Sequence, residues 1–446
     1  MTTASDSVSD APPAYRSGRP WGRAACWLLG LGPFFFLSYG AANWLATMHS
    51  HVGSWVFEWE RNVPFMPWTI IPYWSIDVLY GISLFICATK QELDTHAFRL
   101  LTAQVIAVTC FILFPLTFTF ARPEVGGISG LLFESLGKFD KPFNQAPSLH
   151  IALLVILWDR YAHHVPYWAR WILHGWFVLI GFSVMTTYQH HFIDIPTGAL
   201  LGFACLWAWP DDGSNPLMAS RPTDDAQRLR LAGFYIFGGI AFCALAASTG
   251  GAGLLLFWPA VSLFLVAANY AFRDAAGFQK SPAGKMALAS RWLLAPYIFG
   301  AWVNSRLWTR ADSLPVLVAD GVSVGRFPSR AIASRYTTVI DLCAELPARR
   351  GGTDWRAIPI LDLVTPSAAQ LRLVAAEIEK ARAAGPLLVC CALGYGRSAT
   401  AVATWLLSTG RAVDADAATR HIQSVRPRVV LRDRARDAIA LAGTQP

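Results

Sequence analysis

One stretch decides the fold of the C-terminal part of this chain: Cys391-Ala392-Leu393-Gly394-Tyr395-Gly396-Arg397-Ser398. The apolar run before it, residues 385–390, predicts a short buried strand, and the run after it, residues 398–407, predicts an apolar helix. A loop between such a strand and helix points successive backbone N–H groups, together with the helix N-terminus, at one place. The sequence therefore predicts a small α/β domain with a pocket for a phosphate ester.

The side chains of this loop are those that phosphate transfer requires. The field of the loop and of Arg397 would hold Cys391 as a thiolate, the form that attacks phosphorus. Arg397 would donate two hydrogen bonds to phosphate oxygens beside the backbone of Gly394 and Gly396, and Ser398 would stabilise the departing thiolate. The alternative is a buried structural cysteine beside a glycine turn. The combination of strand, glycines, arginine, serine and helix argues against that alternative.

The loop resembles that of the cysteine-dependent dual-specificity and tyrosine phosphatases, and the resemblance extends from about Leu314 to the C-terminus. Residues 321–328 and 338–342 look like early strands of that fold. Residues 360–367 look like the loop that carries its general acid. The resemblance implies a small α/β phosphatase domain that works through a phosphocysteine.

Asp362 is the candidate general acid, because a leaving alkoxide or phenoxide needs a proton from a group near the phosphate. The chain departs from the family at Cys390, where a histidine usually stands. Cys390 could instead act as a redox partner for Cys391. Adjacent cysteines bridge only with strain, which disfavours that role.

The composition of the chain indicates a membrane protein with a soluble tail. Its 446 residues suggest two or three domains. They include 19 tryptophans and 27 phenylalanines, with 54% hydrophobic and only 15% charged residues. About eight runs are long enough to cross a bilayer: 24–48, 66–88, 100–120, 148–166, 168–187, 192–208, 231–248 and 254–272.

The arginines before the first run, Arg16, Arg19 and Arg23, predict that the N-terminus stays in the cytoplasm. Eight spans would return the chain to the cytoplasm, where the Cys391 domain would then lie. A reducing compartment suits a catalytic thiol. The first run is too long for an ordinary cleaved signal peptide, so we expect an integral protein of a bacterial inner membrane with both termini inside.

The expected fold class is an α-helical polytopic membrane bundle followed by a small α/β cysteine-phosphatase domain. Its expected parts are a disordered tail, a six-span membrane domain, a linker, two further spans, a basic interfacial segment and the phosphatase domain. Their bounds are 1–23, 24–208, 209–230, 231–272, 273–310 and 311–446. Within the basic segment, residues 286–309 read better as an interfacial helix than as a ninth span.

Three polar clusters are expected on the outer face of the membrane. Arg122-Pro123 closes the third run, Pro147-Ser148-Leu149-His150 opens the fourth, and His190-His191-Phe192-Ile193-Asp194 opens the sixth. Ionisable residues at the ends of apolar spans are candidates for function. At a spacing of i, i+4, Asp194 would lie on the helical face of His190 and orient its imidazole. Each histidine alone could simply sit at the membrane interface, but the three clusters together favour a site.

These clusters resemble the pattern of the type 2 phosphatidic acid phosphatase superfamily over about residues 60–208. The resemblance makes His190 the nucleophile that forms a phosphohistidine and Asp194 its orienting carboxylate. It makes His150 the group that protonates the leaving alcohol. Arg122 and Ser148 would hold the phosphate.

Two cations of that pattern are absent, because Pro115 stands at the usual lysine and Val184 at the usual arginine. The short motifs look more like the branch of inositol-phosphoceramide and sphingomyelin synthases, which transfer phospho-head-groups between lipids. Hydrolysis and transfer therefore both remain open for this site. His191 is an alternative nucleophile, although its spacing to Asp194 is less favourable.

The expected partners are membrane lipids, with a lipid phosphate or a phosphoprotein as substrate. The net charge of +8 is explained by arginines that flank the spans and attract anionic lipid, so no nucleic acid is expected. No motif for a metal or cofactor is found. The cysteine loop carries no lysine, which disfavours multiply phosphorylated inositol head-groups.

Three classes of function follow. The first is a bifunctional enzyme with a phosphohistidine phosphatase or phosphotransferase outside and a phosphocysteine phosphatase inside. The second is a membrane-anchored protein-tyrosine or dual-specificity phosphatase whose membrane module only binds lipid. The third is a transporter or scaffold, which would leave the loop at Cys391 unexplained.

Overall fold

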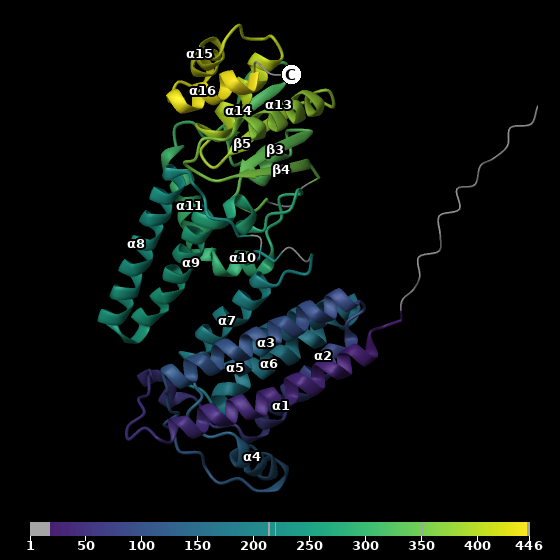
Figure 1. Ribbon diagram of the computed structural model, residues 1–446, viewed down its shortest axis with the longest axis vertical. Helices are drawn as coiled ribbons and strands as arrows, with labels where there is room; N and C mark the ends of the chain where they lie inside the picture. The colour runs from purple at the N-terminus through teal and green to yellow at the C-terminus, as the bar shows by residue number, and fades with distance from the viewer. Residues whose placement is uncertain (1–17, 213–214, 219, 349–351, 444–446) are drawn as a thin grey trace, which may run out of the picture. The chain divides into compact units, whose positions relative to one another are not determined.

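The computed structural model describes residues 18–212, 215–218, 220–348 and 352–443 (Figure 1). The chain divides into two compact units. The first contains residues up to 205 with 209–213, and the second contains 206–208 with residues from 214 onward.

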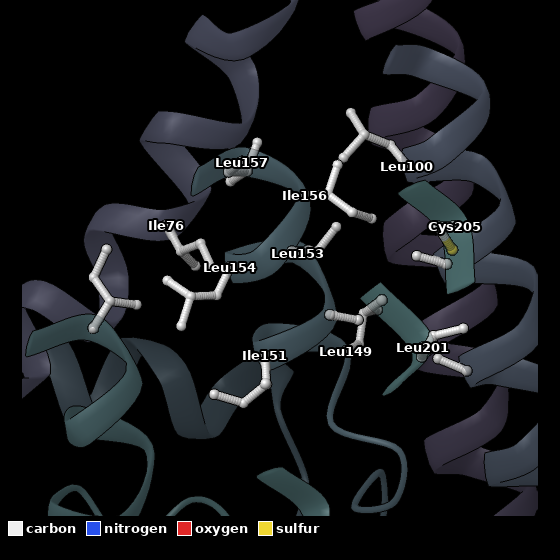
Figure 2. Packing of buried hydrophobic residues seen from close by; sticks show 14 of the residues in the cluster. Ile76, Leu100, Leu149, Ile151, Leu153, Leu154, Ile156, Leu157, Leu201 and Cys205 are labelled. Atoms are coloured by element: carbon white, nitrogen blue, oxygen red, sulfur yellow. The ribbon is translucent and has the colours of Figure 1, made fainter. Parts of the chain in front are cut away.

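Seven α-helices build the first unit: α1 (Trp21–Ala46), α2 (Ile70–Ile86), α3 (Lys90–Leu113), α4 (Gly127–Phe139), α5 (Leu149–His164), α6 (Arg170–Thr186) and α7 (Asp194–Ala208). Short 3₁₀ turns lie at Glu58–Asn62, Pro67–Thr69 and Tyr167–Ala169. Helix α5 is the central one, because apolar side chains around most of its circumference are buried. Figure 2 shows these side chains meeting Ile76 of α2, Leu100 of α3 and Leu201 of α7.

The outer helices of this unit expose large apolar side chains, as helices do when lipid covers them. On α1, Leu29 and Leu37 are 75% and 73% exposed. Surfaces of this kind are rare on soluble proteins. Together with helix length, they are the surfaces expected of helices that could cross a membrane.

Six helical segments in the described part of the chain are long and apolar enough to cross a membrane: Trp21–Ala46, Pro67–Ile86, Lys90–Leu113, Tyr167–Thr186, Ala226–Thr249 and Gly251–Phe278. Six of the eight predicted spans thus correspond to helices that could cross a membrane by length and composition. The other two predicted spans form helices α5 and α7, of 16 and 15 residues. At 1.5 Å per residue these reach only about 24 Å, less than the ~30 Å hydrocarbon core.

The third predicted span, 100–120, was placed too late in the sequence. Helix α3 begins at Lys90 and ends at Leu113, so Arg122 lies in a loop and does not close a helix. Pro115 explains the early end, because proline disfavours helical backbone at the residue before it and cannot continue the helix. The chain beyond Pro115 is extended and bridges Leu116 to Gly53.

The second unit opens with a helical hairpin of α8 (Ala226–Thr249) and α9 (Phe257–Ala268), which run side by side in Figure 1. Close packing of the pair depends on glycine. A Cβ at Gly239 would lie 2.6 Å from the ring of Phe264, and small residues allow helices to approach in this way. A π-turn (Asn269–Arg273), a 3₁₀ turn (Asp274–Phe278) and two helices, α10 (Leu288–Leu293) and α11 (Ala295–Trp308), follow.

Five strands then form one sheet: β1 (Val316–Ala319), β2 (Val322–Arg326), β3 (Thr338–Cys343), β4 (Asp354–Ile360) and β5 (Leu387–Cys391). Their order is β1-β2-β5-β3-β4, with β1 antiparallel to β2 and the other pairs parallel. Strand β5 lies in the centre and is completely buried. Cys391 therefore stands at the carboxyl end of the central strand, where parallel sheets commonly place their sites.

The remaining helices are α12 (Arg330–Ala333), α13 (Ala368–Arg382), α14 (Arg397–Ser408), α15 (Ala415–Val425) and α16 (Asp433–Gly443). Figure 1 shows α13, α14 and α16 gathered beside the sheet. Apolar residues of these helices pack with alternate β5 residues, among them Val389. On the opposite face, Leu388 of β5 packs in a cluster that includes Ile298 and Ala301 of α11. The predicted strand, loop and helix around Cys391 are confirmed.

Candidate functional site

The Cys391 thiol is buried at the point where β5 passes into the loop before α14, and it is 2% exposed. The backbone N–H of Gly394 donates to Cys391 Sγ at 3.2 Å. The hydroxyl of Ser398 lies 3.3 Å from the same sulfur. The predicted partnership of Ser398 with Cys391 is therefore present.

The loop needs glycine at Gly394. The residue has φ +76°, and a Cβ on it would lie 2.4 Å from the carbonyl carbon of Gly325 in β2. Larger residues are excluded both by this conformation and by the neighbouring strand. Gly396 is the residue before α14, so the loop leads directly into a helix N-terminus, where backbone N–H groups favour an anion.

Arg397 is held in place by acidic and carbonyl groups around it. Its guanidinium makes two hydrogen bonds to Glu345, of 2.9 and 2.6 Å, and one to the carbonyl of Ile360 at 2.7 Å. The carboxylate of Asp362 is 2.9 Å from Arg397 Nη2. The Nε–H of Arg397 is buried and has no hydrogen-bond partner among the described residues.

Asp362 follows β4, in the loop that the sequence assigned to the general acid. Burial raises the pKa of Asp362 above its usual value, although Arg397 acts in the opposite direction. The loop is held from outside the sheet: the hydroxyl of Tyr270 donates to the carbonyl of Asp362 at 2.9 Å, and Gln227 donates to that of Leu363. Asp362 therefore lies beside Arg397 with a raised pKa, as a proton donor requires.

Glu345 was missed by the sequence reasoning. It follows β3, is 2% exposed and pairs with Arg397 over a separation of 52 residues. Burial works to raise the pKa of Glu345, but Arg397 outweighs it and lowers that pKa below its ordinary value. Glu345 is therefore ionised and fixes the arginine. The only signal in the sequence is an acidic residue directly after a strongly apolar strand.

Cys390 does not pair with Cys391, and both are free thiols. Cys390 packs with the cluster on one face of the sheet and Cys391 with the cluster on the other. Successive side chains of a strand point to opposite faces, so the suggested redox pairing is wrong.

The first unit brings most of the predicted histidine cluster together. His190 Nδ1 is 3.2 Å from Asp194 Oδ2, and His190 Nε2 is 3.1 Å from Ser148 Oγ. All three residues are buried. The prediction that His190 and Asp194 share one face of a helix is wrong. Helix α7 begins at Asp194, so His190 lies in the segment before the helix. The contact survives because the turn folds the ring back onto the carboxylate.

The neighbouring His191 has both ring nitrogens engaged. Its Nδ1 is 2.8 Å from Glu60 Oε2, and its Nε2 accepts from the backbone N–H of Thr119 at 3.2 Å. Glu60 also accepts from the backbone N–H of Phe192. These contacts favour a positioning role for His191. Glu60 is 131 residues distant in sequence from His191, and no local pattern identified it.

A cavity of about 300 Å³ lies next to His190, within the first unit. His150 lines it, and its ring stacks on Tyr73 with centroids 4.1 Å apart. His150 Nε2 is buried and has no partner among the described residues. The carboxylates of Asp77 and Asp140 line the same cavity. The two histidines therefore face one space, as the sequence predicted.

Arg122 lies beside this cluster but is not among the residues that line the cavity. It donates to the carbonyl of Tyr188 at 3.3 Å, and its guanidinium lies over the ring of Phe133 at 4.7 Å. Its Nε–H is buried without a partner in the described chain. The predicted role in phosphate binding stays a prediction.

A comparison with protein-family models and one with curated proteins give no match for the chain. Among solved structures, the chain is similar to Tk-PTP in its active form, with 23% identity over 30% of this chain and 97% of that one and a TM-score of 0.28. PTPMT1 in complex with PI(5)P matches with 18% identity over 28% of this chain and 92% of its own, at a TM-score of 0.26. Human DUSP28 matches with 20% identity over 28% and 89%, also at 0.26. At such TM-scores, a function can be inferred only from the geometry of the site.

Proposed function

We propose that this chain is a membrane-embedded phosphatase that hydrolyses phosphate monoesters through a phosphocysteine at Cys391, with lipid phosphates as its substrates. One observation carries the proposal. Cys391 ends the central strand, and its loop leads into α14 at Arg397, which has an unpartnered Nε–H and pairs with the carboxylate of Asp362. A buried thiol, a buried guanidinium donor without a partner and an acid with a raised pKa are groups that cluster at functional sites.

Binding of the phosphate would begin at the loop. The dianion accepts from Arg397 Nε–H and from backbone N–H groups at the start of α14, while Glu345 holds the arginine from behind. The same anion competes with Asp362 for the guanidinium, because both carry negative charge. Release of Asp362 from Arg397 removes a contact that favours its ionised form, so substrate binding itself prepares the acid.

Chemistry then follows in two steps. The Cys391 thiolate attacks phosphorus, the S–P bond forms, and the P–O bond to the alcohol breaks as Asp362 gives that oxygen its proton. A water molecule next attacks the phosphocysteine, Asp362 takes one of its protons, and the S–P bond breaks to release phosphate. Ser398 donates to the departing sulfur, from which its hydroxyl lies 3.3 Å.

The setting of the site supports a membrane substrate. Two segments apolar enough to cross a membrane, Ala226–Thr249 and Gly251–Phe278, precede the phosphatase sheet and share a compact unit with it. Tyr270, from the end of this hairpin, bonds directly to the loop of Asp362. We infer that the phosphatase sheet and its helices lie on the cytoplasmic side, with both termini inside, as expected for a reduced catalytic thiol.

A second activity is supported by the cavity of the first unit. We propose a phosphohistidine intermediate on His190 Nε2, with Asp194 fixing the proton on Nδ1 and His150 protonating the leaving alcohol. Whether the phosphoryl or phospho-head-group passes to water or to an alcohol depends on the acceptor that enters this cavity. The residues at Pro115 and Val184 remove two cations that would bind phosphate, and the short motifs around His150 and His190 resemble those of head-group transferases, so hydrolysis and transfer are both open here.

The test is phosphate release by the full-length protein in detergent, from a panel of lipid phosphates and from a phosphotyrosine peptide. Cys391→Ser should abolish release in the cytoplasmic reaction, because serine is a much weaker nucleophile. Cys390→Ser is the matched control, because its side chain packs on the other face of the sheet. Activity that persists in Cys391→Ser and disappears in His190→Ala would refute the phosphocysteine reaction.

The same panel separates the alternatives. Hydrolysis of the peptide with no hydrolysis of lipid phosphates would favour a membrane-anchored protein phosphatase. Loss of a lipid reaction in His190→Ala, with the Cys391 reaction retained, would support two working sites.

A further inference from the structure

The second unit contains a cavity of about 410 Å³ that connects the helical hairpin with the phosphatase residues. At one end its walls are apolar and come from three helices, with Phe242 on α8, Leu263 on α9 and Gly300 on α11. At the other end it is lined by Glu345 and Asp362. A single space therefore runs from the apolar hairpin to the residues that hold Arg397.

The apolar end lies within segments suited to the hydrocarbon layer. Tyr235 and Phe242 both line the cavity and are seven residues apart on α8, which is about 10 Å along a helix axis. Both α8 and α9 belong to segments long and apolar enough to span a membrane. The cavity thus extends along the part of the hairpin where acyl chains are the surrounding solvent.

The polar end is built from the catalytic loops themselves. Glu345 makes two hydrogen bonds to Arg397, and Asp362 pairs with the same guanidinium. The cavity also reaches Ala392, the residue after the nucleophile. A hydrogen bond joins the hairpin to the Asp362 loop, because the hydroxyl of Tyr270 donates to the carbonyl of Asp362.

We infer that this cavity binds the hydrocarbon chain of a membrane lipid whose phosphate monoester reaches Cys391. The inference rests on the proposed phosphocysteine reaction and adds to it a specificity site. The hairpin is then a wall of the binding site as well as an anchor. An apolar chain fits the helical walls, and its phosphate monoester would bind at the loop that carries Arg397. A phosphotyrosine peptide offers no hydrocarbon chain to the hairpin.

The test compares two substrates that share a head-group and differ in the chain, palmitoyl glycerol phosphate and glycerol phosphate, with the full-length protein. Gly300 lines the cavity and no atom lies within 4 Å of its Cβ position, so Gly300→Trp introduces an indole at the cavity wall. The ratio of kcat/KM for the lipid to that for glycerol phosphate should fall about tenfold, the scale of steric discrimination in an apolar pocket. The control is Gly233→Trp, at an exposed and equally open glycine of α8 that does not line the cavity, and it should leave the ratio unchanged.

The outcomes distinguish this inference from the proposed reaction. If Cys391-dependent hydrolysis of para-nitrophenyl phosphate is absent from the wild type, the reaction itself is wrong and the cavity inference fails with it. If that hydrolysis is present but Gly300→Trp leaves the ratio unchanged, only the cavity inference is overturned.

A second measurement does not depend on turnover. Palmitoyl glycerol phosphate with a diazirine at the end of the chain is photolysed with the Cys391→Ser variant, and labelled peptides are identified by mass spectrometry. Label should appear near Phe242 and Leu263 and be competed by unlabelled palmitoyl glycerol phosphate. Equal labelling by a diazirine phosphatidylcholine, which has no phosphate monoester, would overturn the inference.

Discussion

Replacing Lys280 with methionine should destabilise the phosphatase sheet. Lys280 lies between the hairpin and the sheet, and its ammonium donates to Asp341 Oδ2 at 2.6 Å and to the carbonyls of Cys343 and Leu346 at 2.5 and 2.7 Å. Both charged side chains are fully buried. Although burial opposes the charged form, Asp341 raises the pKa of Lys280 above its ordinary value, so the ammonium is retained.

The magnitude follows from what the substitution leaves behind. Removing one partner of a buried ion pair costs about 3–5 kcal/mol, because the other charge stays buried without its partner. Asp341 keeps hydrogen bonds from Cys343 N–H and from the indole of Trp355, which places the expected loss near 3 kcal/mol. That corresponds to a roughly 100-fold increase in the equilibrium constant for unfolding of the sheet.

The assay uses the buried thiols of the sheet. Cys343 and Cys390 are both 0% exposed, so a maleimide labels them only when the sheet opens. Full-length protein in detergent is pulsed along a urea series, and labelling of each cysteine is quantified by mass spectrometry. With a slope of about 2 kcal/mol per molar urea, the labelling midpoint of Lys280→Met should fall by about 1.5 M.

Two controls accompany this measurement. Lys285→Met removes an exposed lysine nearby and should leave the midpoint unchanged. Cys205, buried in the first unit, should show the same midpoint in all variants. The double variant Lys280→Met/Asp341→Leu should recover part of the stability, since it removes the unpaired charge. An unchanged midpoint in Lys280→Met would refute the reasoning.

Three further predictions concern the two sites. Burial raises the pKa of Asp362, and the acid works in its protonated form, so kcat/KM should fall as pH rises through that raised pKa. In Asp362→Asn, kcat/KM should be lower and its fall at alkaline pH should vanish. Profiles of kcat/KM against pH with an alkyl phosphate test this. Gly394→Ala forces a Cβ to 2.4 Å from Gly325 at a positive φ. It should lower the free energy of unfolding by roughly 1–3 kcal/mol and abolish phosphate release. Gly410→Ala, with a similar φ but open space around its Cβ position, should keep activity. His190→Asn should abolish lipid-dependent transfer in the first unit, measured with radiolabelled phospholipid, while hydrolysis of para-nitrophenyl phosphate by Cys391 persists; loss of both activities would contradict two separate sites.

Much of the phosphatase domain could be predicted from local sequence. The strand ending at Cys391, the loop and helix α14 all lie within one continuous stretch, so their geometry follows from short-range backbone preferences and the loop glycines. Asp362 lies in the loop after β4, within the stretch 360–367 that the sequence assigned to the general acid, whereas strand β4 itself was not predicted. The apolar runs likewise predicted most of the long apolar helices, because length and hydropathy are properties of a single segment.

The predicted helix boundaries were wrong where residues beside an apolar run end the helix. Helix α3 ends early because Pro115 cannot continue it. Helices α5 and α7 are shorter than a span, since loops at their ends take up residues that look apolar enough to continue. His190 reaches Asp194 from a turn and not from a helix.

The sequence by itself determined which residues carry the chemistry: a cysteine, an arginine and a serine in one loop, and a histidine close to an aspartate. Tertiary structure alone decided what holds them. Glu345 meets Arg397 across 52 residues, Lys280 meets Asp341 across 61 and Glu60 meets His191 across 131. It also decided that the helical hairpin lines a cavity ending at Asp362. The physical reason is that side chains distant in sequence meet only when the chain has folded, and no local periodicity records that path.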